Sequence, residues 1–190
     1  VDGDNGAGPL VGYRALEAAM EIARGAGMAI AFARGSNHFG PVAPYCLIAA
    51  DAGFASVIGS NATTTIAPWG GRDERLGNNP LGMCVPNPDA AGNPIMLDMA
   101  MSVVARAKIR QALVRGESIP PSWATDRDGR PTTDPQAALE GFLQPAGGYK
   151  GYGLAVMVDM LAGVLSGAAY LTHVRSWVDN PDAPQNLGHF

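Results

Sequence analysis

The sequence predicts a layered α/β domain, and three observations support this prediction. The 190 residues are 47% hydrophobic and 16% charged, a balance that supplies a large buried core and argues against disorder. The 25 Gly and 15 Pro indicate many tight turns. Between residues 13 and 60, helical and strand patterns alternate with short loops, as in α/β folds.

The N-terminal third of the chain contains two predicted helix–strand pairs. Leu16, Met20 and Ala23 recur at helical spacing and predict a helix over residues 11–26, ended by the glycines that follow. The apolar run 28–33 predicts a buried strand. We expect a helix over residues 44–52 and a strand over 54–60.

The middle of the chain is turn-rich. Residues 67–80 are polar and contain many glycines, which predicts loops. Two apolar runs, 81–85 and 95–97, predict strands on either side of a turn over residues 86–94.

The C-terminal part begins with a predicted helix over residues 100–114. Four prolines between residues 116 and 135 predict an extended surface loop. The strongest helical pattern covers residues 152–165 and is apolar nearly all round, so we expect this helix to be buried.

Charge and composition disfavour several classes of partner. The net charge is −4 with no Lys/Arg block, which disfavours nucleic acid and anionic membranes. No run approaches the roughly 18 apolar residues of a membrane span, and no secretory signal pattern is visible. Cys46 and Cys84 lack metal-ligand spacing, so we expect buried thiols in a reducing cytoplasm, with no metal site.

A histidine motif follows the first predicted strand. Ser36, Asn37 and His38 lie where ligands gather in layered α/β proteins, at the carboxyl end of a strand. An imidazole there can accept or donate a proton, because its ordinary pKa is near 6.5. The two preceding side chains could orient the ring or bind substrate. The alternative is a structural histidine.

Several other polar positions have both a functional and a structural interpretation. Asn61 ends the second predicted strand and could line the same cleft, or make an ordinary turn. The loops 68–71 and 77–80 could present N–H groups to a phosphate, or be plain turns. Asp98 could contact a cofactor, or cap the predicted helix after it.

Lys150 gives the clearest physical indication of a ligand. It lies among glycines at the start of the predicted buried helix, where the helix dipole favours anions rather than cations. A bound anion would be attracted by both the dipole and the ammonium group. The alternative is an exposed lysine in a flexible loop.

Missing motifs narrow the chemistry further. The sequence contains no GxGxxG, GxxxxGK[ST], GxSxG or HExxH motif, which argues against a Rossmann domain, a P-loop, a nucleophile elbow and a zinc peptidase. His173 and His189 lie among loop residues, and we interpret both as structural.

Taken in order, the motifs resemble those of the type 2 malate/L-lactate dehydrogenase family, which includes ureidoglycolate, sulfolactate and diketogulonate dehydrogenases and cyclic-imine reductases. The resemblance spans nearly the whole chain. It is carried by VDGDNG (1–6), SNHFG (36–40), APWGG (67–71) with LGNNP (76–80), IMLDMAMSVVA (95–105), DGRPTTDP (128–135) and GGYKGYGLAVMVDMLAGVLSGA (147–168).

The resemblance implies a mixed-sheet, non-Rossmann fold that binds NAD or NADP, and a cytoplasmic homodimer with active sites near the subunit interface. It implies that His38 exchanges a proton with the oxygen of a small 2-hydroxy or 2-oxo acid. The cofactor contacts that it implies are Asn61, Ala62, Pro94, Ile95, Met96, Leu97, Asp98, Met99, Ala100, Tyr149 and Lys150. Ser36 and Asn37 are expected at the substrate.

Three departures from the family pattern affect these expectations. Ala62 stands where a serine is common, residues 41–45 replace an Ala-Gly-Tyr-Tyr-like run, and Ala107 replaces a glycine before Lys108. The family is also longer at both ends, so residues 1–190 are expected to be the central cofactor-binding and catalytic region of an incomplete chain.

The expected activity is hydride transfer between NAD(P) and a 2-hydroxy acid such as malate or lactate. A cyclic-imine reductase and a non-catalytic cofactor-binding fragment are the alternatives. No residue is a clear partner for a 2′-phosphate, so NAD and NADP both stay open. We expect His38 and Lys150 to face one common cleft.

Overall fold

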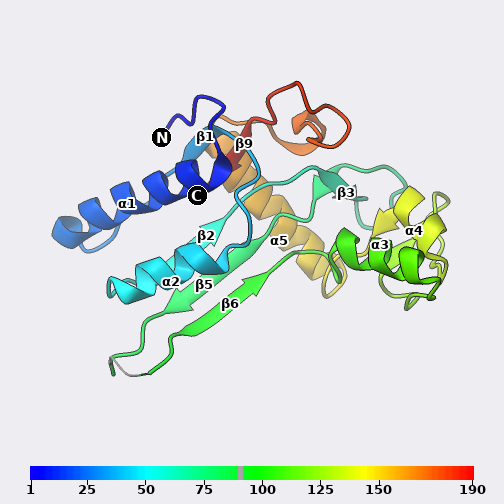
Figure 1. Ribbon diagram of the computed structural model, residues 1–190, viewed down its shortest axis with the longest axis horizontal. Coiled ribbons are helices and arrows are strands. Elements are labelled where there is room, and N and C mark those ends of the chain that lie inside the picture. The colour runs from blue at the N-terminus through cyan, green and yellow to red at the C-terminus, as the bar shows by residue number, and fades with distance from the viewer. Residues whose placement is uncertain (90–91) are drawn as a thin grey trace.

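The computed structural model describes residues 1–89 and 92–190, and it shows helices and strands in alternation along most of the chain (Figure 1). The helical segments are α1 (Gly8–Ala26), α2 (Ala43–Asp51), α3 (Arg106–Arg115), α4 (Pro135–Glu140), α5 (Tyr149–Asp159), the π-helix η1 (Met160–Leu165) and the 3₁₀ helix η2 (Leu171–His173). The strands are β1 (Ala33–Ser36), β2 (Ser56–Gly59), β3 (Thr64–Ile66), β4 (Leu76–Gly77), β5 (Leu81–Val85), β6 (Ile95–Met99), β7 (Ala124–Thr125), β8 (Phe142–Leu143) and β9 (Leu187–His189).

The strands form three small sheets. β2, β5 and β6 make an antiparallel sheet in the order β2-β5-β6. β1 pairs with β9 in antiparallel orientation and has an isolated parallel bridge from Arg34 to Asp2. The third sheet has the order β4-β3-β8-β7 and contains one parallel pair, β3 with β8. The prediction of a mixed α/β fold is therefore confirmed.

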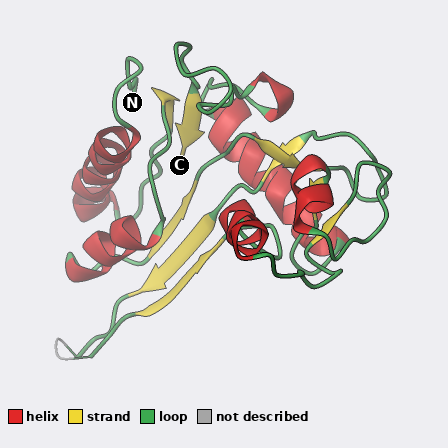
Figure 2. Cartoon of the chain, turned by 45° about the vertical axis from the view of Figure 1, so that its right-hand side comes forward, coloured by secondary structure: helices red, strands yellow, loops and turns green. Residues whose placement is uncertain are grey.

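The helices cover these sheets on two sides. α2 packs on β2 and β5, and α1 contacts α2 and β1. α5 lies across the strands from α1 and α2 (Figures 1 and 2). The largest buried apolar cluster joins the inner side of α5 to α3, α4 and the four-stranded sheet, and includes Ile66, Leu76 and Ile109. A second cluster, around Val42 and Cys46, fills the space between α2 and the sheet.

Most of the N-terminal predictions agree with the structure. The first helix is confirmed; it begins at Gly8 because Pro9 suits a first turn, and Gly27 ends it at φ 84°. The second helix and the strand after it are confirmed as α2 and β2. The buried strand over residues 28–33 is wrong. Met28 and Ile30 are 80% and 61% exposed, and pairing starts at Ala33, where β9 begins to lie alongside.

The central hairpin is confirmed as β5 and β6, although its predicted turn includes residues 90 and 91, which lie outside the described part. The helix over residues 100–114 begins only at Arg106. The preceding residues are not helical, because the N–H of Met101 donates to Asn78 O and Ser102 bridges to Pro145. The predicted loop 116–135 contains the short strand β7, and neither α4 nor β8 was predicted.

The strongest predicted helix is present, but it is not buried all round. It begins at Tyr149 and changes from α to π geometry at Met160. Leu154, Met157 and Leu165 are 52%, 56% and 62% exposed, so one side of the helix is open. Hydropathy shows that the residues of this helix are apolar, but it does not show which of their side chains pack against other elements. Within the described ranges, no helix has the length and apolar character needed to cross a membrane.

Candidate functional site

His38 lies in a loop that begins at the carboxyl end of β1, as predicted. Its side chain is exposed, and its backbone N–H donates to Gln185 Oε1 at 3.0 Å. The N–H of Gly40 donates to His38 Nδ1 at 3.2 Å. A ring nitrogen that accepts a hydrogen bond carries no proton, so the neutral ring holds its proton on Nε2. This tautomer presents Nε2 as the nitrogen for an external ligand.

The residues before His38 hold the loop in place. The hydroxyl of Ser36 is fully buried, and its oxygen lies 2.7 Å from Nε2 of His189. Asn37 donates from Nδ2 to the backbone carbonyls of Asn5 and Gly6, both at 3.0 Å. Both side chains are thus engaged within the protein, which differs from the predicted contact with substrate. That contact stays a prediction.

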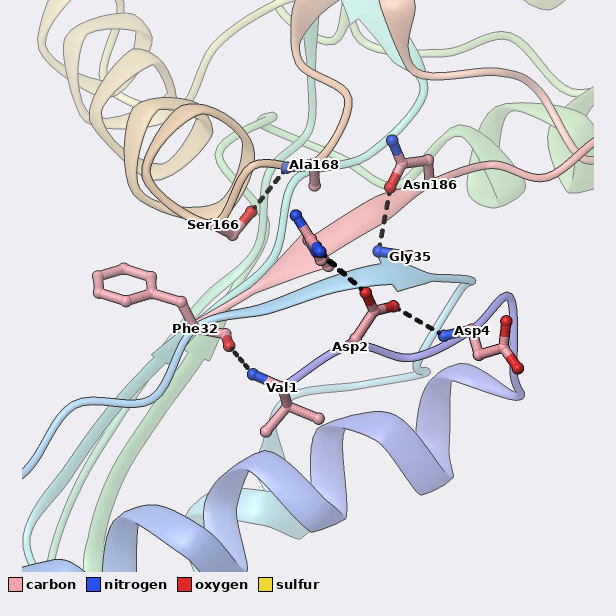
Figure 3. Close-up of polar contacts among 9 residues, drawn as sticks. Val1, Asp2, Asp4, Phe32, Gly35, Ser166, Ala168 and Asn186 are labelled. Carbon is pink, nitrogen blue, oxygen red and sulfur yellow. Dashed lines mark hydrogen bonds and ion pairs between the residues drawn. The ribbon is translucent and has the colours of Figure 1, made fainter.

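The N-terminal motif forms the outer edge of this region (Figure 3). The amino group of Val1 donates to Phe32 O at 2.7 Å, and Asp2 pairs with Arg34 at 3.0 Å. The N–H of Gly35 donates to Asn186 Oδ1 at 3.0 Å, which joins β1 to the residue preceding β9 (Figure 3). The first residues of the chain therefore brace the strand that carries His38.

Asn61 ends the second strand as predicted, but its side chain is buried and bonded to backbone. Nδ2 donates to Ala169 O at 2.6 Å, and Oδ1 accepts from the N–H of Gly188 at 3.0 Å. The N–H of Ala62 donates to Asn79 Oδ1 at 3.0 Å. The amide of Asn61 thus has a protein partner on both sides, and its contact with a cofactor stays a prediction.

The loop 77–80 is built around Asn79, which is also fully buried. Its Nδ2 donates to Ala155 O in α5 at 2.9 Å. The loop thus connects the end of β2 with the middle of α5, and a contact of its N–H groups with a phosphate stays a prediction.

The segment from Pro94 to Ala100 contains β6, whose side chains are mostly exposed. Asp98 caps a helix, but not the one predicted. It lies within the strand opposite Gly82, and its Oδ2 accepts from the N–H of Ala43, at the start of α2, at 2.9 Å. The predicted cap on a following helix is wrong because the next helix begins only at Arg106.

Tyr149 and Lys150 form the first turn of α5, and both are exposed. The residue before them, Gly148, has φ 67°, and no side chain caps this end of the helix. The ring of Trp69 lies against Gly148 and is edge-on to Tyr149 with centroids 6.5 Å apart. Exposed aromatic rings, backbone N–H groups and an ammonium group are therefore gathered at one helix end.

His38 follows β1, which contacts η1, whereas Lys150 lies in the first turn of α5, so the common cleft expected for the two residues stays a prediction. α5 and η1 follow each other directly, with 11 and 6 residues, which corresponds to roughly 25 Å of helix. β1 and β9 contact η1, and Lys150 is at the opposite end (Figure 1).

Two cavities accompany these residues. One, of about 840 Å³, lies between α1, α2 and β2 and reaches Phe39 and His189. The other, of about 410 Å³, is lined by Trp69, Arg72 and Gln144. Neither His38 nor Lys150 lines either of these two cavities.

Comparison with known proteins establishes the family. A family model described as malate/L-lactate dehydrogenase matches residues 1–190. The chain belongs to this family. The resemblance seen in the sequence motifs is therefore confirmed.

Individual members of the malate/L-lactate dehydrogenase family agree with the match. The chain is 38% identical to a malate dehydrogenase of Pyrococcus horikoshii, over 100% of the chain and 53% of the relative. It is 41% identical to an L-sulfolactate dehydrogenase of Methanothermobacter thermautotrophicus, over 96% and 52%. The structure of the Methanocaldococcus jannaschii sulfolactate dehydrogenase superimposes with a TM-score of 0.89 at 38% identity, over 99% and 53%. The chain spans about half the length of these relatives.

Two buried ionisable residues lie inside this family fold. Burial raises the pKa of Asp159, against the lowering effect of hydrogen bonds from Leu171 and Asn79. Burial, aided by the charge of His38, lowers the pKa of His189 to about 4, so this ring is neutral at physiological pH. Sequence reasoning placed His189 correctly among structural residues but found no partner for it, because its partners, Ser36 and Ser60, are 153 and 129 residues away.

Stability should depend on pH through His189. In the unfolded chain its pKa is near 6.5, and in the fold it is about 4, so the unfolded state binds more protons between these values. The free energy of unfolding should fall as the pH decreases from about 6.5 to about 4, by up to about 3 kcal/mol from this group.

Denaturant unfolding across this pH range, in wild type and in His189→Gln, measures the contribution of His189. The wild-type curve should be steeper, and the exposed His173→Gln serves as control because its slope should match wild type. Equal slopes in wild type and His189→Gln would contradict the assignment of a neutral buried ring.

Proposed function

We propose that the protein is an NAD(P)-dependent oxidoreductase that interconverts a small 2-hydroxy acid and its 2-oxo acid. The proposal rests on family membership and on one observation in this chain. An exposed imidazole, His38, is held on a braced loop at the carboxyl end of β1. Relatives named for malate and sulfolactate support the substrate class.

The start of α5 fits a phosphate or ribose of a dinucleotide. It presents backbone N–H groups without a side-chain cap, beside the exposed ammonium of Lys150. Lys150 is in the first turn of α5 and His38 follows a strand that contacts η1, so a single ligand that reaches both must be long, as a dinucleotide is. The family contains relatives named for NADP⁺ and for NAD⁺, so either cofactor is compatible.

The reaction takes a hydride from C2 of the hydroxy acid and a proton from its hydroxyl. The bound nicotinamide supplies hydride acceptance and donation. In oxidation, His38 accepts the hydroxyl proton at Nε2 as C2 becomes a carbonyl carbon, and in reduction it returns that proton to the carbonyl oxygen. To accept at Nε2, the ring must first carry its proton on Nδ1. This tautomer gives up the bond from Gly40, which at 3.2 Å is at the long end of the normal range.

A titration and an activity screen test the proposal together. NADH and NADPH fluorescence titrations of the full-length protein measure binding, and a panel of malate, lactate, ureidoglycolate, sulfolactate and their 2-oxo acids measures turnover. Turnover of at least one 2-oxo acid is expected. Binding without turnover would instead identify a non-catalytic cofactor-binding module.

A second candidate reaction is the reduction of a cyclic imine acid. The chain is 38% identical, over 88% of its length, to a Burkholderia ambifaria protein named delta(1)-pyrroline-2-carboxylate reductase 1. The same panel should therefore include piperideine and pyrroline carboxylates. Turnover of these imines alone would favour this candidate over the hydroxy acid.

A homodimer is also proposed from family membership, and light scattering at several concentrations tests it.

Lys150→Ala should weaken cofactor binding about 10-fold at low salt, because a partly screened ammonium–phosphate contact is removed. The difference from wild type should shrink as salt increases. The fluorescence titration measures both, and Lys108→Ala, an exposed lysine in α3, is the matched control. An unchanged dissociation constant in Lys150→Ala would remove this residue from the cofactor site.

A further inference from the structure

His189 lies at the centre of the region that carries His38. It is the last residue of β9, is 2% exposed, and pairs with Ala33 of β1 on one side and with Ser60 after β2 on the other. Its ring connects the two strand ends through side chains. Nε2 is 2.7 Å from the hydroxyl oxygen of Ser36, and Nδ1 is 2.9 Å from that of Ser60.

The hydrogen bonds around the ring have one consistent direction. The Ser60 hydroxyl lies 2.8 Å from Asn61 O and 3.2 Å from Gly188 O, so its single proton goes to a carbonyl. Ser60 must then accept from Nδ1–H of His189. In a neutral ring Nε2 is therefore an acceptor. The Ser36 oxygen lies 2.7 Å from Nε2 and 3.3 Å from Asn37 O, so Ser36 donates over the shorter distance, to the ring. A neutral ring satisfies both serines at once, and the lowered pKa of His189 agrees with this state.

The same ring contacts the His38 loop on both flanks. Ser36, two residues before His38, binds the ring edge, and Phe39, one residue after it, stacks on the ring face with centroids 4.2 Å apart and planes at 5°. Phe39 is fixed in turn by Tyr45, which stacks on it and donates from its hydroxyl to Phe39 O at 2.6 Å. The backbone N–H of His38 is held by Gln185, on the chain leading into β9.

We propose that His189 is a positioning residue for His38. Its ring fixes the loop from Ser36 to Phe39 relative to the end of β2 and so sets where the imidazole of His38 meets the substrate oxygen. This inference rests on the proposed function, in which His38 exchanges the proton. His189 itself is buried and takes no part in the proton transfer.

Two substitutions at His189 separate its two hydrogen bonds. His189→Asn places an amide N–H near the position of Nδ1 and retains the bond to Ser60, but loses Ser36. His189→Gln places an amide oxygen near Nε2 and retains the bond from Ser36, but loses Ser60. Both lose the stacking on Phe39, so their difference compares the bond to Ser36 with the bond to Ser60. We expect His189→Asn to lower kcat about 10-fold to 10²-fold, as expected for a misplaced catalytic group, with cofactor affinity unchanged. His189→Gln should retain the higher kcat; equal values or the reverse order would overturn the proposal.

The His38→Ala background shows whether the effect acts through His38. If His189 only positions His38, His189→Asn should cause no further loss of kcat once the imidazole is absent. A further loss by the same factor would mean general damage to the fold and would overturn the inference. A His38→Ala variant with normal turnover would instead overturn the proposed function, so the two failures are distinguishable.

Ser36→Ala provides a milder test if the His189 variants unfold. It removes the hydroxyl that binds Nε2 and leaves β9 unchanged. We expect a decrease in kcat of similar order, which is not additive with that of His189→Asn. Thermal unfolding of each variant measures whether the fold is retained. Wild-type kcat in a folded Ser36→Ala protein would overturn the proposal.

Discussion

His38→Ala is expected to lower turnover about 10²-fold to 10⁴-fold, the usual contribution of a general acid–base group. The methyl group of alanine can neither accept the hydroxyl proton in oxidation nor return it in reduction. The cofactor dissociation constant should stay near wild type, because the proposed cofactor contacts of Tyr149 and Lys150 are at the far end of the helical segment from β1. Steady-state kinetics with a fluorescence titration of NADH measure the two quantities separately.

His173→Ala is the matched control for this experiment. His173 is also exposed, but it lies in η2 beside Tyr170, with ring centroids 5.3 Å apart, and no proposed role in the reaction involves it. Its turnover should match wild type. Near-normal turnover in His38→Ala would remove His38 from the reaction, and a large loss in His173→Ala would show that the assay reports something other than His38.

Gly188→Ala is expected to destabilise the fold by about 3 kcal/mol or more, at the upper end of overpacking effects. A Cβ at Gly188 would overlap the backbone carbonyl of Ala162 in η1 and crowd the hydroxyl of Ser166. Neither backbone can move easily, because Gly188 N–H donates to Asn61 Oδ1 and β9 is held between β1 and Ser60. Denaturant unfolding measures the loss as a change in the free energy of unfolding.

The same substitution at Gly25 should have the opposite sign. Gly25 lies within α1, is exposed, and a Cβ there would meet nothing within 4 Å. Gly25→Ala should therefore stabilise the protein by about 0.5–1 kcal/mol through helix propensity. A Gly188→Ala protein with wild-type stability would show that η1 and β9 can separate without cost.

The sequence predicted the elements whose information is local. Helix periodicity and the glycines that end the pattern located α1, and two apolar runs located β5 and β6. The prediction failed where the local structure depends on a partner that is far away in the sequence. Nothing between residues 28 and 36 shows that β9 will pair only from Ala33 onward. Likewise, the chain before α3 has helical composition but forms no helix there, because its backbone N–H groups donate to the carbonyls of Asn78 and Gln144.

The predictions for the candidate site show the same difference between local and distant information. The position of His38 after a strand and of Lys150 at a helix start follow from nearby residues, and both were predicted. The side chains of Ser36, Asn61 and Asp98 were expected at ligands, yet each is bonded within the protein. Buried polar groups and helix ends require hydrogen-bond partners. A short polar side chain at a strand end can bond to such a group within the protein as readily as to a ligand. Sequence alone does not distinguish these uses.

The contact between Ser36 and His189 also has a consequence for how the protein is made. Its two residues are 153 positions apart. At about 5–20 residues per second, a ribosome needs roughly 10 to 30 s to add the second after the first. Throughout that interval the His38 loop lacks its contact with the His189 ring. A nascent chain that stops before β9 contains every residue of the loop, but the ring that orients them is absent. Synthesis of β9, rather than of the motif itself, is therefore the event that completes the geometry around His38.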